Sequence, residues 1–190
     1  MPRALDTLPP FDAHGNLQVI IETPKGSRNK FKYEPKLGLF MLSGVLPQGA
    51  IFPFDFGFVP CTSAPDGDPL DVLVLMDEPA FAGCLLTTRL IGVIEAEQTE
   101  HGETTRNDRL IGVAENSRDH RHIERLDDLN PNLLAEIEHF FVSYNTAKGK
   151  EFTIRARHGP DRARAIVVEA QRPTPRRRRR SAGSSARRSG

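Results

Sequence analysis

Residues 66–71 read Asp-Gly-Asp-Pro-Leu-Asp and run directly into the apolar stretch Val-Leu-Val-Leu-Met. Glycine and proline favour a tight turn, and the short apolar run has the composition of a buried strand. A turn anchored on such a strand can bring the carboxylates of Asp66, Asp68 and Asp71 close together. Clustered carboxylates raise one another's pKa unless a cation lies among them. This segment is therefore either a cation site or an acidic surface turn.

The donors available in this segment are oxygens only, with no histidine or cysteine nearby. Such donors favour a hard divalent ion, namely magnesium, manganese or calcium, over zinc. A calcium EF-hand loop also begins Asp-x-Asp. Here, however, Leu70 stands where that loop needs a ligand, and Asp71 stands where it needs glycine. The EF-hand interpretation is therefore excluded.

The pattern of apolar residues predicts strands first and helices late. Alternation indicates strands at 17–22 and 30–34, joined as a hairpin by turn residues, which on its own is typical of a solvated edge hairpin. Further short strands are expected at 52–58, 72–76, 84–95, 109–114 and 152–156, with an acidic connection at 97–103. Helical periodicity begins at Asn130-Pro131 and again at Gly159-Pro160. The sequence thus predicts an α+β, mostly β fold: a small closed β-barrel, or a strongly curved sheet, with two or so helices packed outside.

Charge is distributed unevenly along the chain. Its 190 residues carry a net charge of +1, but residues 173–190 hold seven arginines and no acid, which leaves 19 basic against 25 acidic residues elsewhere. We therefore expect one domain over residues 1–172 and a disordered arginine-rich tail over 173–190. A solvated extension is the favoured interpretation of the tail, with weak nucleic-acid contact as the alternative. An acidic body is not typical of a nucleic-acid-binding domain.

The two cysteines and the first eleven residues indicate in which cellular compartment the protein is expected. Cys61 and Cys84 stand in unrelated contexts, which argues against a disulfide framework and agrees with a reducing environment. Residues 1–11 contain no apolar signal core, and no run approaches the length of a membrane span. A cytoplasmic protein without membrane contact is expected.

The longer string Asp-Gly-Asp-Pro-Leu-Asp-Val-Leu-Val resembles the signature of the family I soluble inorganic diphosphatases, or pyrophosphatases. The resemblance extends over most of residues 17–158 and is carried by further motifs: Glu22, Lys32 with Glu34, Phe52-Pro53, the phenylalanine-rich segment that ends at Tyr144, and Lys148-Gly149-Lys150. It implies an oligonucleotide-binding-like barrel and magnesium-dependent hydrolysis of pyrophosphate to two phosphates by a metal-activated water. It also implies a homo-oligomer.

The resemblance also implies roles for individual residues. Asp66, Asp68 and Asp71 would form the metal set for Mg²⁺, with Mn²⁺ as a substitute, and Asp68 would be the general base. Substrate-binding residues would be Lys32, Arg109 and Tyr144 on phosphoryl oxygens, and Glu22 and Glu34, which hold metal-bound waters or orient Lys32.

Several positions depart from the family pattern. Residues 37–52 lack the usual phosphate-binding arginine, and neutral residues replace functional ones at Phe52, Phe56, Asn107 and Asn145. Arg109 stands for a lysine, a further acid aligns only loosely with Thr99 or Glu100, and Asp108 or Arg106 are candidates to compensate through a shifted loop. These departures support an alternative: a weakly active or inactive relative that binds phosphoanhydrides or metal, with the tail reserved for an acidic partner.

Overall fold

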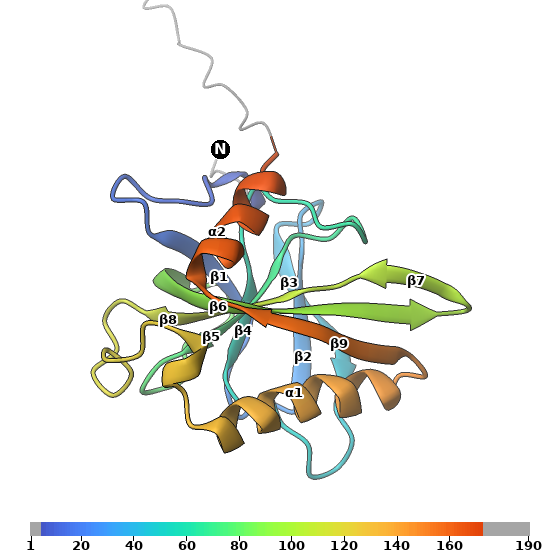
Figure 1. Ribbon diagram of the computed structural model, residues 1–190. Coiled ribbons are helices and arrows are strands. Elements are labelled where there is room, and N and C mark those ends of the chain that lie inside the picture. The colour runs from blue at the N-terminus through green and yellow to red at the C-terminus, as the bar shows by residue number, and fades with distance from the viewer. Residues whose placement is uncertain (1–4, 173–190) are drawn as a thin grey trace, which may run out of the picture.

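The computed structural model describes residues 5–172, so the expected tail at 173–190 lies outside the described residues (Figure 1). Neither α-helix of the described part has the length and hydropathy needed to cross a membrane. The elements, in chain order, are η1 (Leu5–Thr7), β1 (Leu17–Thr23), β2 (Asn29–Glu34), β3 (Leu39–Val45), β4 (Asp55–Phe58), β5 (Asp71–Leu75), β6 (Leu85–Glu100), β7 (Glu103–Arg106), β8 (Arg109–Ala114), η2 (Leu126–Asp128), α1 (Pro131–Thr146), β9 (Glu151–His158) and α2 (Pro160–Glu169).

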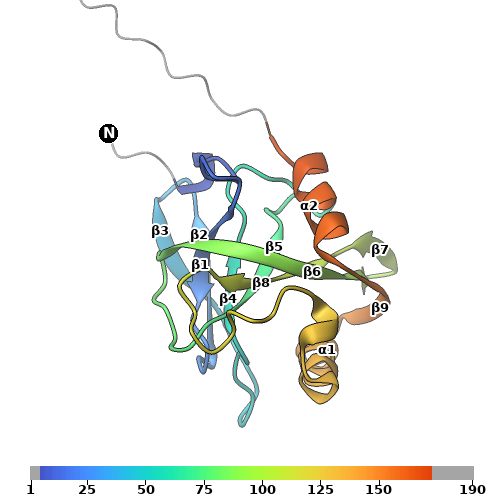
Figure 2. The same cartoon turned by 60° about the vertical axis from the view of Figure 1, so that its left-hand side comes forward.

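Five of the strands close into a ring. β1 pairs with β4, β4 with β5, β5 with β8 and β8 with β6, and the pairing of β6 with β1 completes the circuit. All of these pairs are antiparallel except β5 with β8. The long β6 also pairs with β7 and β9, and both helices lie outside the strands, α2 on one side of the β6–β9 pair and α1 on the other (Figures 1 and 2). The predicted mostly β fold with two external helices is confirmed.

The strand that carries the aspartate turn is buried on both faces. In β5, Val72 and Val74 pack with α2 residues in one hydrophobic cluster, whereas Leu73 and Leu75 pack with α1 residues in another. All four are inaccessible to solvent, which explains why this strand reads as a continuous apolar run rather than an alternating one. β5 is therefore a rigid support for Asp71, its first residue.

The predicted hairpin between residues 17–22 and 30–34 is wrong. β2 pairs with β3, and β1 pairs with β4 and β6. β3 was not expected because its sequence, Leu-Phe-Met-Leu-Ser-Gly-Val, does not alternate. The Thr23 side chain accepts a hydrogen bond from the Phe31 amide (3.0 Å), so β2 lies against the end of β1 without joining its sheet.

The acidic connection expected at 97–103 is also incorrect. β6 continues to Glu100, and β7 follows after the tight turn at His101 and Gly102, both of which have positive φ. The two strands pair from Glu97 opposite Arg106 to Glu100 opposite Glu103. β6 is therefore longer than its apolar part, because backbone pairing with β7, and not burial of side chains, holds its last residues in the strand.

We expect Gly57→Ala to destabilise the ring by about 1–3 kcal/mol, the usual cost of overpacking. A Cβ at Gly57 would overlap the carbonyl oxygen of Ile20 on the neighbouring β1, so the β1–β4 pairing would have to shift. Gly44→Ala is the matched control, because a Cβ there meets no atom within 4 Å. Urea unfolding of both variants measures the difference, and equal losses would contradict the close approach.

Candidate active site

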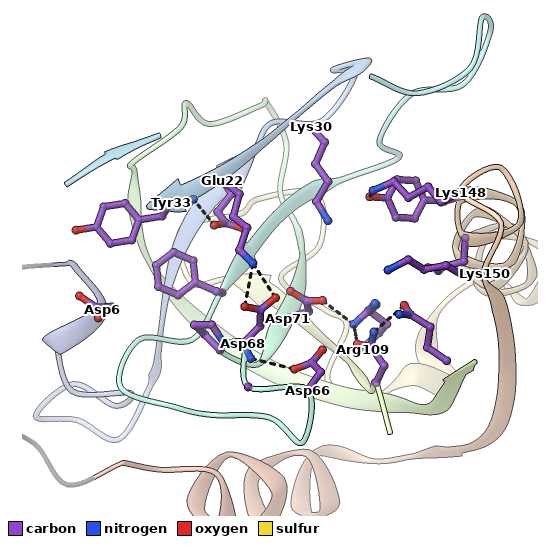
Figure 3. Close-up of a pocket in the computed structure, with 18 of the residues that line it drawn as sticks. Asp6, Glu22, Lys30, Tyr33, Asp66, Asp68, Asp71, Arg109, Lys148 and Lys150 are labelled. Atoms are coloured by element: carbon purple, nitrogen blue, oxygen red, sulfur yellow. Dashed lines mark hydrogen bonds and ion pairs between the residues drawn. The ribbon is translucent and has the colours of Figure 1, made fainter. Parts of the chain in front are cut away.

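A cleft of about 300 Å³ opens beside the start of β5 (Figure 3). Residues from β1, β2, β8, α1 and the 66–71 turn line it, so segments far apart in the sequence meet there. The structure brings together all but one of the site residues that the sequence indicates: Glu22, Lys32, Asp66, Asp68, Asp71, Arg109 and Tyr144.

Glu34 is the exception. It does not line the cleft, and its carboxylate accepts a hydrogen bond from the Lys36 amide (3.1 Å) in the turn that leads to β3. Glu34 is the last residue of β2, and this hydrogen bond stabilises the turn between β2 and β3. The structure therefore gives no support to the expected role of Glu34 in orienting Lys32 or holding water.

The aspartate turn is held by its own hydrogen bonds. Asp66 accepts from the Asp68 amide (3.1 Å), and the Ala64 amide donates to the Asp68 carbonyl (2.7 Å). Gly67 has a φ of 86°, a conformation that glycine adopts at little cost. Burial raises the pKa of the Asp66 carboxyl, and the nearby charges of Asp71 and Asp68 raise it further despite the opposing amide hydrogen bond. The carboxylates are thus close enough to repel one another.

Two cationic side chains hold the other two carboxylates. The Lys32 ammonium contacts both oxygens of Asp68, at 2.7 and 2.9 Å, in a largely exposed pair. The Arg109 guanidinium donates to Asp71 (2.6 Å) and to the side-chain oxygen of Asn107. Arg109 is buried, and its guanidinium lies 5.2 Å from the ring centre of Phe141. Arg109 is therefore fixed in place, whereas Lys32 can exchange partners readily.

An amide pair lies next to Arg109. The side-chain nitrogen of Asn107 donates to the side-chain oxygen of Gln98 (3.0 Å), and both residues line the cleft. The β6 side chain that contacts Asn107 is thus Gln98, whereas the loose alignment pointed to Thr99 or Glu100. Thr99 hydrogen-bonds to Thr104 and Glu100 pairs with Lys150. This part of the cleft therefore presents neutral oxygens.

Asp108 and Arg106 do not compensate for Asn107. Strand alternation directs residues 107 and 109 toward the cleft and residue 108 away from it. Asp108 accepts from the Arg106 guanidinium (2.6 Å) and from the Ala96 amide (3.1 Å), and both Arg106 and Asp108 line a separate cavity. The shifted loop that would bring either residue into the cleft is not observed.

The cleft also contains cations that the sequence analysis did not assign. Lys30 projects from β2, and Lys148 and Lys150 come from the segment between α1 and β9 (Figure 3). Alternation along β2 places Lys30 on the same strand face as Lys32, which is the signal that could have identified it. Lys150 pairs with Glu100 at 2.7 Å.

The donor set is chemically suited to a hard divalent cation. Asp66, Asp68, Asp71 and Glu22 all line one cleft and offer oxygens only. Within residues 5–172, however, no three acidic, histidine or cysteine side chains already form a preformed metal cage. Asp68 is instead paired with Lys32, and Asp71 with Arg109. The residues present fit the ion, provided that it displaces these side-chain contacts.

Glu22 makes the pH dependence of the metal-free protein predictable. Burial raises the pKa of its carboxyl from 4.5 to about 7, against the opposing effect of a hydrogen bond from the Tyr33 amide (2.6 Å). The stabilisation from the protonated form is complete below pH 4.5 and is lost as pH rises through 7, a change of about 3 kcal/mol. We expect Glu22→Gln to remove this loss. Urea unfolding in chelator across pH 4–8 measures it, and parallel pH profiles for both proteins would contradict the prediction.

Comparison with known proteins agrees with this geometry. The family model for inorganic pyrophosphatase matches residues 19–174. The inorganic pyrophosphatase of Nostoc sp. is 36% identical over 166 residues, which cover 87% of this chain and 96% of that protein. That of Synechocystis sp. is 34% identical over 165 residues, covering 87% and 95%. The crystal structure of inorganic pyrophosphatase from Thermus thermophilus superposes with a TM-score of 0.80 at 33% identity, over 88% of this chain and 97% of that one. The chain therefore belongs to the inorganic pyrophosphatase family.

Proposed function

We propose that this protein hydrolyses inorganic pyrophosphate to two phosphates, with magnesium as its cofactor and manganese as a substitute. The observation that carries the proposal is the single cleft in which Asp66, Asp68 and Asp71 face the cationic side chains of Lys32 and Arg109. Pyrophosphate is a dense anion, so its hydrolysis requires both neutralisation of its charge and a base for the attacking water.

The carboxylates would share the work of binding the cation and activating water. Asp66 and Asp71, together with Asp68, would hold the cation. When bound, a divalent cation supplies charge neutralisation and makes water a competent nucleophile near neutral pH. The Asp68 carboxylate would accept the proton of the attacking water once the cation has displaced the Lys32 ammonium, which contacts both of its oxygens in the metal-free protein.

Phosphoryl oxygens would be bound by Arg109 and Tyr144, which line the same cleft. Arg109 presents a planar guanidinium that suits a phosphate, and its contacts with Asp71 and Asn107 hold it at the cleft. Tyr144 presents a phenol hydroxyl from the last turns of α1. Glu22, near the end of β1, also lines the cleft and would hold metal-bound waters or orient Lys32. Because Gln98 and Asn107 are neutral, we expect weaker cation binding than an all-carboxylate set would give.

We also propose a homo-oligomer and a cytoplasmic location. The exposed apolar side chains of Leu39, Met41, Leu42 and Val45 on β3 support self-association, because neighbouring exposed apolar side chains often mark an interface. Two cysteines in unrelated contexts support the compartment. Gel filtration with light scattering tests the first proposal, and a monomer at micromolar concentration would contradict it.

The proposed substrate is tested by comparing phosphate release from pyrophosphate with release from a phosphomonoester. Magnesium is titrated first, and manganese is then titrated in its place. We expect saturable, metal-dependent release from pyrophosphate and much slower release from the monoester. Equal rates on both substrates would indicate a general phosphatase and would contradict the assignment.

A further inference from the structure

The cleft has a second wall, formed by Lys30, Tyr144 and Lys148, that is positively charged, whereas the aspartate turn is negatively charged. Lys30 from β2 and Lys148 from the segment after α1 approach this wall from two sides (Figure 3). Within the described part of the chain, Lys32 and Lys150 are paired with Asp68 and Glu100, whereas neither Lys30 nor Lys148 has a carboxylate within ion-pair distance. Two ammonium groups therefore remain available for an external anion.

Both ammonium groups lie at Tyr144. The Lys30 nitrogen is 5.3 Å from the centre of the Tyr144 ring, and the Lys148 nitrogen is 4.4 Å from it and donates to its hydroxyl. Contacts with ring faces orient an ammonium but leave its N–H donors free for other acceptors. The two lysines and the phenol thus place several hydrogen-bond donors around one point.

The aromatic core holds this arrangement rigid. The Tyr144 ring stacks on Phe140 with ring centres 5.8 Å apart and contacts Phe52 at 6.0 Å. The Lys30 nitrogen also lies 5.4 Å from the ring centre of Phe56. Phe52 and Phe56 lack the hydroxyls of the family tyrosines, but Phe52 still packs against Tyr144 and Phe56 packs against Phe52.

The charges around the Tyr144 hydroxyl also favour a bound anion. Burial raises the pKa of its phenol, but the positive charges of Lys30 and Lys148 and their hydrogen bonds outweigh burial, so that the pKa is lowered. A site that favours the negative form of a phenol also favours other anions at the same point. Two like charges held on one ring repel each other, and a bound anion relieves that repulsion.

We propose that Lys30 and Lys148, with the Tyr144 hydroxyl, bind one phosphoryl group of the substrate directly and without a metal ion. The aspartate turn then serves the other phosphoryl group, so the cleft neutralises its diphosphate with cationic side chains at one end and with a cation at the other. The inference deepens the proposed function and rests on it for the identity of the substrate.

This assignment accounts for two of the departures in the chain. Residues 37–52 contain no arginine or lysine, and β3 places Gly44 directly opposite Lys30 in the β2–β3 pairing. Lys30 on β2 thus supplies a positive charge to the cleft, whereas β3, which pairs with β2, contains no arginine or lysine. Asn145 is buried and donates to the Phe141 carbonyl (2.8 Å), so the lysine after Tyr144 that contributes here is Lys148.

Calorimetric titration in chelator tests the proposal on the full chain, with inorganic phosphate and the non-hydrolysable imidodiphosphate as probes. We expect measurable binding without metal, and about tenfold weaker binding in Lys30→Gln and in Lys148→Gln, since each loses a charge-assisted hydrogen bond. Lys36→Gln is the matched control, because Lys36 is exposed in the turn of the same hairpin and does not line the cleft. Circular dichroism confirms that each variant is folded.

Steady-state kinetics with pyrophosphate separates this inference from the proposed function. The two cleft variants should raise KM more than they lower kcat, because they remove binding and leave the base Asp68 in place. If the wild type binds imidodiphosphate through these lysines but does not hydrolyse pyrophosphate, the proposed function fails and the anion site stands. Affinities and KM values that match the wild type in either cleft variant, or binding that requires magnesium, would overturn the inference.

Discussion

Replacing Asp68 with asparagine is expected to lower kcat for pyrophosphate hydrolysis by about 10²- to 10⁴-fold, the usual contribution of a positioned general base. Asparagine has the same shape and can still accept a hydrogen bond from Lys32, but it cannot take a proton from water. The Lys32–Asp68 pair is largely exposed, so its loss should cost at most about 1 kcal/mol of stability. The variant therefore isolates the chemical role from folding.

The measurement for Asp68→Asn is single-turnover phosphate release at saturating metal, with metal affinity determined by calorimetry. Asp127→Asn provides the control, because Asp127 is exposed in η2 and does not line the cleft. A variant as fast as the wild type would exclude Asp68 as the base. Loss of rate with an equal loss of metal affinity would instead make Asp68 chiefly a ligand.

Asp71→Ala should have two separate effects, on metal affinity and on stability. Removal of a carboxylate weakens cation binding, and it also leaves the buried guanidinium of Arg109 without the ion pair it now makes at 2.6 Å. Breaking a buried pair costs about 3–5 kcal/mol, and the partial exposure of Asp71 places the expected loss near the lower limit, at about 3 kcal/mol.

Asp71→Asn separates these two effects. Asparagine keeps a neutral acceptor for Arg109 but is a poorer cation ligand than a carboxylate, so it should recover part of the stability and little of the metal affinity. Urea unfolding in chelator gives the first quantity and calorimetry with magnesium gives the second. Unchanged metal affinity in Asp71→Ala would exclude Asp71 as a ligand.

The local features of the site could be predicted from the sequence. The turn at 66–71 is set by its own glycine and by hydrogen bonds among its residues, and the strand behind it is apolar throughout. The positions of Asp66, Asp68 and Asp71 therefore depend little on distant parts of the chain. The assignment of Lys32 came instead from the resemblance to the diphosphatases, because alternation along residues 30–34 marks Lys30 and Glu34 equally.

Pairing between distant strands could not be predicted in the same way. β1 joins β4 and β6, whereas the pattern of residues 17–34 favoured pairing between sequence neighbours. Gln98 was missed because β6 extends past its apolar part. Alternation grouped Glu34 with Lys32, but its carboxylate accepts a hydrogen bond from the Lys36 amide and does not line the cleft. Which face a residue presents depends on these partners, and alternation along one strand does not specify them.

Phosphate release from pyrophosphate by the full chain tests the central claim most directly. The measurement compares magnesium over a broad concentration range with chelator and with a no-enzyme reaction, and repeats the series with manganese. The account predicts two phosphates per pyrophosphate, a rate that saturates with metal, and complete loss of the rate in chelator. Release that stays at the no-enzyme background with both metals would contradict it and would leave a protein that only binds phosphoanhydrides or metal.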